Sequence, residues 1–138
     1  MVSNNANNAN TPEVVFPELS YQIVGSAFSV LNELGYGLPE KAYQDGLERE
    51  FTERGLEFQR EPYLPLSYHQ KYLSRYFADF VVAEKIVVET KVVKKLGYTQ
   101  VKQVLGYLRS SGMKLGILIY FTSEGVKYRR ILNSKVSA

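Results

Sequence analysis

The sequence predicts an α/β protein, a mixed sheet flanked by helices, with the element order α-α-β-β-β-α-β-β. Three observations lead to this class. Apolar residues recur at helical spacing in the first part of the chain, as they do in amphipathic helices. After Gly55 the spacing changes, and aromatic and β-branched residues typical of strands become frequent. One further helical stretch then precedes two more apolar strands.

Two helices are expected before the sheet. The first covers residues 18–34, where apolar side chains return every three or four positions and Gly35 supplies the stop. The second has Pro39 in its first turn and ends at Gly55, because proline is favoured at helix starts and glycine just after helix ends. Its inward positions are Tyr43, Leu47 and Phe51.

Five strands and a third helix are expected in the rest of the chain. The predicted strands cover residues 56–68, 73–82, 86–93, 115–121 and 126–132. A polar turn at His69-Gln70 joins the first two strands. The third helix precedes the last two strands; it is expected to be capped by Thr99 and closed by Gly112.

Length and composition indicate one folded domain. Residues 1–15 are Asn-rich with almost nothing to bury, so they are expected to form a disordered tail. Residues 16–138 are enough for a single hydrophobic core. No run approaches the roughly 20 apolar residues of a membrane span, and no signal-peptide pattern opens the chain. A cytoplasmic location is therefore expected.

The composition excludes several kinds of catalytic site. The chain has no cysteine, which rules out disulfides, thiolate metal sites and thiol nucleophiles. Its single histidine, His69, argues against a His-based zinc site and against a Ser-His triad. Carboxylates, lysines and hydroxyls remain as the groups that could carry chemistry.

Charge is distributed unevenly along the chain. Residues 1–62 carry ten acidic and four basic side chains, whereas residues 63–138 carry four acidic and thirteen basic ones. A cationic surface from the second half would suit a polyanionic partner. On charge alone, an ordinary solvated face explains the pattern equally well.

Three charged residues lie in one of the most apolar runs of the chain, ADFVVAEKIVVETKVV at residues 78–93. If residues 83–85 form a three-residue hairpin loop, Asp79 lies opposite Glu89. Opposed carboxylates about 5 Å apart repel one another by roughly 3 kcal/mol, so the pair needs a cation between its members or a proton on one of them. Lys91 follows Glu89 by two residues and shares its face of the strand.

Two interpretations of these charges are open. Paired carboxylates can form a hard-oxygen site for Mg²⁺ or Mn²⁺. The three charges can equally be a surface ion cluster on a solvated sheet face, and such structural networks are common. The register is also an assumption, because a two-residue turn at Glu84-Lys85 would break the opposition.

The same residues resemble the core of the PD-(D/E)XK nuclease superfamily, in which an Asp on one strand is followed by Glu-X-Lys on the next. Here these are Asp79 and then Glu89-Thr90-Lys91, with Ala78 where the motif has proline. The segment GLPEKAY at residues 37–43 fits the GxxExxY pattern of one branch, and QVLGYLRSSG at residues 103–112 resembles the helix after its Glu-X-Lys strand. The resemblance covers residues 16–133 and implies a restriction-endonuclease-like core.

This resemblance implies metal-dependent hydrolysis of a nucleic-acid phosphodiester, with DNA as the expected substrate and Mg²⁺ or Mn²⁺ as the cofactor. The implied metal ligands are Asp79, Glu89, the carbonyl of Thr90, and Glu40 from the second helix. Lys91 would orient water or offset charge in the transition state, and Gln103 would lie beside the active-site strand. From the residues alone, Gln103 can also be an ordinary helix-face amide, and Glu40 a carboxylate favoured by the helix dipole. The basic residues Lys94, Lys95 and Lys102 would either contact phosphates or remain solvated.

One departure and two rival functions remain. Relatives in this branch carry polar Glu and His in the first helix, where this chain has SVLN at residues 29–32. This difference concerns the expected substrate contacts more than the expected catalytic residues. The rivals are a nucleic-acid-binding module that does not cleave and a protein-interaction domain presenting the aromatic strand at residues 63–76. The eleven tyrosines suit either. The sequence leaves open whether the protein forms a homodimer.

Overall fold

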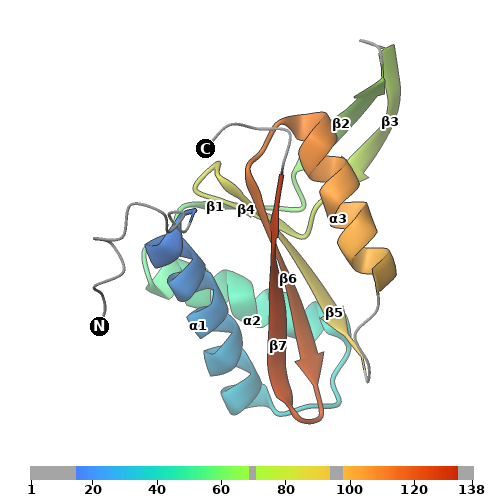
Figure 1. Ribbon diagram of the computed structural model, residues 1–138. Helices are drawn as coiled ribbons and strands as arrows, with labels where there is room; N and C mark the ends of the chain where they lie inside the picture. Colours follow the sequence, from blue (N-terminus) through green and yellow to red (C-terminus); the bar gives the residue numbers. More distant parts are fainter. Residues whose placement is uncertain (1–14, 69–70, 94–97, 134–138) are drawn as a thin grey trace, which may run out of the picture.

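A five-stranded mixed sheet with helices on both faces forms the body of the protein (Figure 1). The computed structural model describes residues 15–68, 71–93 and 98–133 of the chain. The order of elements along these residues is α1, α2, β1 to β5, α3, β6 and β7. The fold class predicted from the sequence is therefore confirmed. The predicted tail falls largely outside the described residues, and its disorder stays a prediction.

Helices α1 (Pro17–Leu34) and α2 (Glu40–Glu53) pack together on one face of the sheet. Both agree with the predicted helices to within two residues. The expected inward positions Tyr43, Leu47 and Phe51 are fully buried. In the core beneath these helices, the ring of Tyr43 stacks on Phe121 at 4.6 Å.

The strands of the main sheet are β1 (Phe58–Arg60), β4 (Phe80–Val82), β5 (Ile86–Val92), β6 (Leu115–Thr122) and β7 (Gly125–Leu132). They lie in the order β1-β4-β5-β6-β7. Only the β5–β6 pair is parallel, because α3 connects these two strands and returns the chain to the same end of the sheet.

The first two predicted strands are each divided in the structure. Residues 56–68 form β1 and β2 (Tyr63–Tyr68), and residues 73–82 form parts of β3 (Lys71–Phe77) and β4. The prediction of two long strands was wrong because Glu61 adopts a left-handed conformation, φ 51°, and the following Pro62 has no N–H for a sheet ladder. The β2–β3 hairpin therefore leaves the main sheet and lies beside α3 (Figure 1). The expected turn at His69-Gln70 lies outside the described residues.

Helix α3 (Tyr98–Ser111) covers the face of the sheet opposite α1 and α2 (Figure 1). Val104 and Leu108 pack against strand residues that include Val87 and Leu118. Thr99 lies within the first turn, so the predicted cap at this residue was wrong. Gly112 ends the helix with φ 77°, as expected.

The described helices give no sign of a membrane-spanning segment, since none is both long enough and apolar enough to cross a bilayer.

Candidate active site

The β4–β5 hairpin places Asp79 next to Glu89. Val82 pairs with Ile86 and Phe80 with Val88, the register that a three-residue loop requires. Asp79 lies just before β4, where the regular strand pairing ends. Its backbone N–H donates instead to Oε1 of Glu89, at 2.8 Å. The two carboxylates that the sequence predicts as opposed are therefore neighbours at the open end of this hairpin.

The carboxylates of Asp79 and Glu89 each bind a backbone N–H of the other strand. Glu89 accepts from the N–H of Asp79, and Oδ2 of Asp79 accepts from the N–H of Thr90 at 2.7 Å. Each N–H dipole points at a carboxylate oxygen and offsets part of the repulsion expected for the pair. From the sequence, a cation or a proton is expected for this purpose, but backbone N–H groups are not.

A buried hydroxyl adds a further bond to Asp79. The Thr90 side chain is fully buried, and its Oγ1 donates to Oδ2 of Asp79 at 2.8 Å. The same oxygen accepts from Nε2 of Gln44, at 3.1 Å. Gln44 also lies 3.3 Å from Oε2 of Glu40, one turn earlier on α2. Sequence reasoning missed Gln44, although its spacing of four residues from Glu40 placed it on the same helix face.

Glu40 begins α2, directly after Pro39, and its carboxylate lies against the end of β5. Burial raises the pKa of Glu40 above its ordinary value, and the charge of Asp79 adds to the increase. The charge of Lys91 and a hydrogen bond from the Val92 backbone act in the opposite direction. These interactions show that the predicted ligand from the second helix lies within electrostatic reach of Asp79 and Lys91.

The predicted residues approach the end of the sheet from both of its faces. Val87 belongs to the core under α3, and alternation along β5 places Glu89 and Lys91 on that face. Thr90 points to the other face, where it meets Gln44 of α2. Figure 1 shows the start of α2, the end of β5 and the start of α3 at the same end of the sheet.

The residues of this arrangement lie in a stretch of sequence that matches a known protein family. The family model of the PD-(D/E)XK nuclease superfamily matches residues 17–131, most of the chain. The chain belongs to this superfamily. Asp79 and the Glu89-Thr90-Lys91 segment lie within the matched residues. No curated protein sequence matches the chain.

Two solved structures are similar to this PD-(D/E)XK domain to different degrees. The crystal structure of SSO0001 matches with a TM-score of 0.54 and 19% sequence identity, over 85% of this chain and 57% of that one. An alkaline exonuclease from Laribacter hongkongensis, LHK-Exo, matches with a TM-score of 0.47 and 11% identity, over 84% and 83% of the two chains. The likeness to SSO0001 shows the fold, and this chain spans little more than half of that protein.

Helix α3 contributes one residue to the PD-(D/E)XK site region that sequence reasoning did not name. Burial raises the pKa of the Tyr107 phenol, and the negative charge of Glu89 raises it further. Gln103, which was predicted to lie beside the active-site strand, is exposed one turn before Tyr107 on the same side of α3. The spacing of four residues between the two was the available signal for Tyr107.

The basic residues predicted to contact phosphates are only partly described. Lys94 and Lys95 lie outside the described residues. Lys102 is exposed on α3. Its position is compatible with either of the two roles expected for it.

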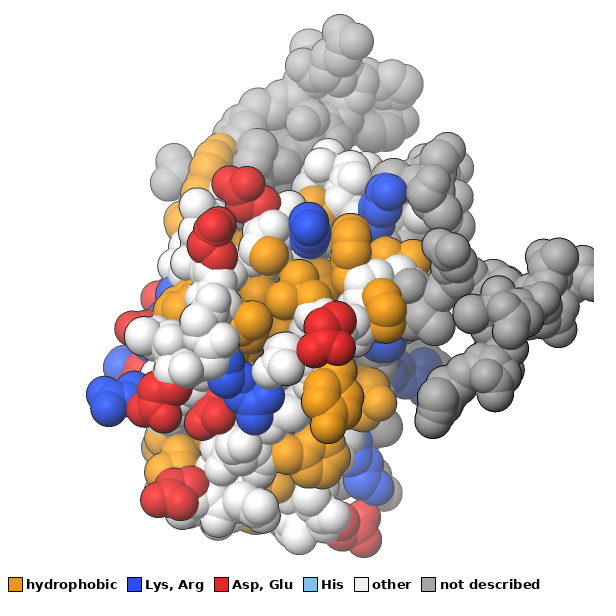
Figure 2. Space-filling model, turned by 90° about the vertical axis from the view of Figure 1, so that its left-hand side faces the viewer, with side chains coloured by type: hydrophobic (Ala, Val, Ile, Leu, Met, Phe, Trp, Pro, Cys, Tyr) orange, Lys and Arg blue, Asp and Glu red, His pale blue; other side chains and the backbone are white. Residues whose placement is uncertain are grey.

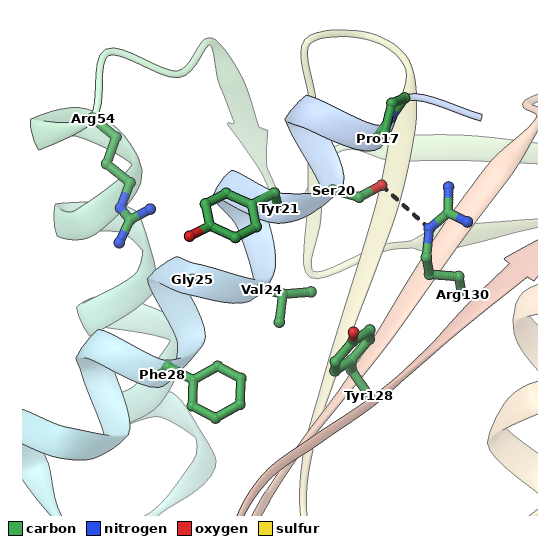
Figure 3. A pocket seen from close by; sticks show the side chains of 9 residues that line it. All are labelled: Pro17, Ser20, Tyr21, Val24, Gly25, Phe28, Arg54, Tyr128 and Arg130. Atoms are coloured by element: carbon green, nitrogen blue, oxygen red, sulfur yellow. Dashed lines mark hydrogen bonds between the residues drawn. The ribbon is translucent and has the colours of Figure 1, made fainter. Parts of the chain in front are cut away.

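A second concave region of the PD-(D/E)XK domain is a groove of about 640 Å³ between α1 and β7 (Figure 3). Tyr21, Phe28 and Tyr128 supply aromatic walls. Arg54 is bound to Glu50 at 3.1 Å, and Arg130 donates to Ser20 at 3.4 Å. No carboxylate lines this groove in the described chain, so it is not the candidate catalytic centre.

Proposed function

We propose that this protein is a metal-dependent nuclease that hydrolyses phosphodiester bonds in DNA. The observation that carries the proposal is that Asp79 lies beside Glu89, with Glu40 within electrostatic reach of Asp79 and Lys91, at one end of the sheet in a member of a nuclease superfamily. A pure binding module has no need for carboxylates gathered in this way, because each repels the phosphates of its ligand.

The residues present fit a hard divalent cation such as Mg²⁺ or Mn²⁺. Asp79 binds its protein partners through Oδ2, so its Oδ1 is the natural metal-facing oxygen. Glu89, Glu40 and the carbonyl of Thr90 would supply further oxygen ligands. Within the described residues no group of three or more acidic or His side chains is arranged to hold a metal ion, so the proposed site depends on a carboxylate pair completed by backbone oxygen, water and substrate. Mg²⁺ is commonly held by one or two carboxylates, water and substrate phosphate.

Bound here, the ion would polarise the phosphoryl oxygen and lower the pKa of a coordinated water. The chain's own groups would position the reactants. Lys91, half-buried beside the carboxylates, would orient the attacking water or offset negative charge that grows on the phosphate. Tyr107, next to Glu89, and Gln103 would complete the wall formed by α3.

We further infer that the chain belongs to the GxxExxY branch, because each motif residue has a local task. Gly37 adopts φ 113°, a conformation that favours glycine. Tyr43 donates its hydroxyl hydrogen to the carbonyl of Gly35 at 2.6 Å and accepts from the N–H of Leu38 at 3.2 Å. These bonds hold the loop that leads into α2, the helix that Glu40 begins, and so support a role for the motif in positioning Glu40.

Calorimetric titration of Mn²⁺ tests the metal site. We expect the wild-type protein to bind Mn²⁺ and the Asp79→Ala/Glu89→Ala variant to lose binding. A Glu33→Ala/Glu57→Ala variant removes two exposed carboxylates elsewhere and should bind as the wild type does. Equal binding by all three proteins would argue against a metal at Asp79 and Glu89.

A cleavage assay tests the activity. Wild-type protein should degrade DNA in Mn²⁺ or Mg²⁺, and Lys91→Ala should bind the metal yet cleave at least 100-fold more slowly, since removal of one group that stabilises a transition state costs about 10²–10³ in rate. Salt-dependent DNA binding without cleavage would support the inactive binding module instead. Absence of both binding and cleavage would support the protein-interaction domain.

A further inference from the structure

The basic residues of the described chain differ in their partners between the two faces of the sheet. On the side of α1 and α2, every basic residue from position 15 to 61 lies within 4.0 Å of a carboxylate. The pairs are Lys41–Asp45 at 3.2 Å, Arg49–Glu53 at 2.6 Å, Arg54–Glu50 at 3.1 Å, and Arg60 with Asp45 and Glu48 at 2.7 and 2.9 Å. Figure 2 shows acidic and basic side chains intermixed on this side. Each of these cations therefore has a carboxylate beside it, although the exposed pairs of Lys41 and Arg49 are weak.

The α3 side carries basic residues with few acidic neighbours. Residues 98–133 contain six basic residues and a single acidic one, Glu124. One of the six, Arg130, lies on the α1 side, where it donates to Ser20. Glu124 lies 3.5 Å from Lys127, and both side chains are well exposed. Such a surface pair contributes little and does not hold the lysine in place. Lys102 and Arg109 on α3 are exposed, and no carboxylate of the described residues forms an ion pair with them.

Two of these cations project from the edge strand β7 toward α3. Val126 belongs to the core under α1 and α2, whereas Ile131 belongs to the core under α3. Since side chains alternate along a strand, Lys127 and Arg129 point to the α3 side with Ile131. The positive charge of Arg129 lowers the pKa of Tyr120, a residue of the α3-side core, against the larger increase caused by burial.

The same face carries Glu89 and Lys91, and the strand register aligns these site residues with the cations of β7. Lys91 pairs with Tyr120, and Tyr120 pairs with Lys127. Glu89 is connected through Leu118 to Arg129 in the same way. Neighbouring strands lie about 4.8 Å apart, so the cations of β7 are about 10 Å from the site residues, measured along the sheet.

We propose that Lys102, Arg109, Lys127 and Arg129, the α3–β7 cationic surface, bind the phosphate backbone of the nucleic-acid substrate. The bound strand extends from Lys91 toward the β7 edge of the sheet. This inference rests on the proposed nuclease function and adds the direction from which the substrate approaches. The acidic helices α1 and α2 repel a polyanion, whereas the α3 side attracts it, so the charge distribution orients the encounter.

Binding of a fluorescein-labelled DNA oligonucleotide in EDTA, single-stranded and duplex, tests the proposal without cleavage. Lys127→Gln/Arg129→Gln removes two phosphate contacts, and each contact contributes about 0.9 to the slope of log K against log salt for duplex DNA. The ratio of wild-type to variant affinity should therefore fall by about tenfold between about 50 and 200 mM salt. For Lys102→Gln/Arg109→Gln, the ratio of wild-type to variant affinity should also fall as the salt concentration rises.

The matched control is Lys41→Gln/Arg49→Gln, which removes the same charge from α2. Its DNA affinity and salt slope should stay within twofold of the wild type. Thermal unfolding and the Mn²⁺ titration should be unchanged in the β7 variant, which separates loss of contact from loss of fold. If the β7 and α3 variants bind DNA as tightly as the control while the wild type binds and cleaves, the proposal that the α3–β7 cationic surface binds DNA is wrong. If the wild type neither binds nor cleaves DNA, the proposed nuclease function itself is wrong.

Discussion

Thr90 contributes a buried side chain to the candidate site, whereas the sequence suggested only its carbonyl. Its hydroxyl donates to Asp79 and accepts from Gln44, and all of this takes place in a fully buried position. Asp79 is thereby fixed by two bonds from one residue. A carboxylate held in one orientation loses less entropy when it binds a metal ion.

Thr90→Val tests this role, because it keeps the side-chain shape and removes the hydroxyl. The amide of Gln44 and the carboxylate of Asp79 each lose a partner, and an unsatisfied buried polar group costs about 1–3 kcal/mol. We expect a loss of that size in the free energy of unfolding, measured by urea denaturation, and weaker Mn²⁺ binding by calorimetry. Thr90→Ser retains the hydroxyl and should bind Mn²⁺ like the wild type. Normal binding by Thr90→Val would assign the hydroxyl to packing alone.

Glu40 is held in the folded protein at a cost to stability. Burial is the main reason that its pKa lies above the ordinary value of 4.5. A carboxyl whose pKa is raised by folding binds its proton more tightly in the folded state. The free energy of unfolding therefore increases as pH falls through the raised pKa, and the penalty is fully present above it.

Glu40→Gln should remove this penalty. Without metal, we expect the variant to have a higher Tm than the wild type at about pH 7, and the difference should vanish below about pH 4, where the wild-type carboxyl is protonated. The exposed substitution Glu33→Gln serves as a control and should show little difference at either pH. Mn²⁺ binding should weaken in Glu40→Gln only. An unchanged Tm at neutral pH would contradict the burial cost.

At the scale of elements, the register of the β4–β5 hairpin could be predicted from the length of its loop. A three-residue loop was enough to pair Val82 with Ile86 and to bring Asp79 beside Glu89. The loop contains Ala83 and Glu84 in left-handed conformations, φ 54° and 57°, which non-glycine residues adopt at a cost. Pairing of the apolar strands on either side offsets this cost.

Helix α3 approaches the sheet closely at one glycine. A Cβ atom added at Gly116 would lie 2.6 Å from Cγ1 of Val104. Gly116→Ala should therefore push α3 outward and destabilise the protein by about 1–3 kcal/mol, as overpacking does elsewhere. Because Tyr107 lies on the same helix, DNA cleavage should fall as well. Urea denaturation and the cleavage assay measure the two effects, and Gly106→Ala, where no atom lies within 4 Å, is the control. Equal stability of both variants would show that the helix position is not fixed by this contact.

At the scale of the whole molecule, the candidate site joins elements that are distant in sequence. Glu40 and Gln44 come from α2, whereas Asp79 and Thr90 come from the β4–β5 region. A metal ion that binds only this assembled site stabilises the folded state. Free Mn²⁺ at about 100 times its Kd should add about 2.7 kcal/mol to the free energy of unfolding.

This linkage is measured as a rise in Tm with Mn²⁺ concentration. The Asp79→Ala/Glu89→Ala variant should show no rise, whereas Glu33→Ala/Glu57→Ala should follow the wild type. A rise of the same size in all three proteins would indicate metal binding elsewhere on the chain.

The distribution of charge over the surface can also be described only for the whole molecule. The sequence shows an acidic first part and a basic second part, which alone does not define a surface. In the structure the acidic helices α1 and α2 cover one face of the sheet and α3 covers the other, so their charges lie on opposite faces. The proposed approach of substrate from the α3 side rests on this arrangement.

The sequence by itself determined the helices, the fold class and the placement of Asp79 beside Glu89. These features depend on local patterns: apolar spacing, glycine and proline positions, and one short loop. It did not determine where the long aromatic strands break, because the left-handed turn at Glu61 is a single-residue event within a continuous β-like pattern.

Only the tertiary structure decided how the site is held together. The bonds from Gln44 to Thr90, the electrostatic contact of Tyr107 with Glu89 and the alignment of Lys127 with Lys91 join residues 18 to 46 positions apart. Such contacts arise when helices pack on a sheet and strands pair across it. Helical spacing could place Gln44 beside Glu40 and Tyr107 beside Gln103, but their contacts with Thr90 and Glu89 across the fold were visible only in the tertiary structure.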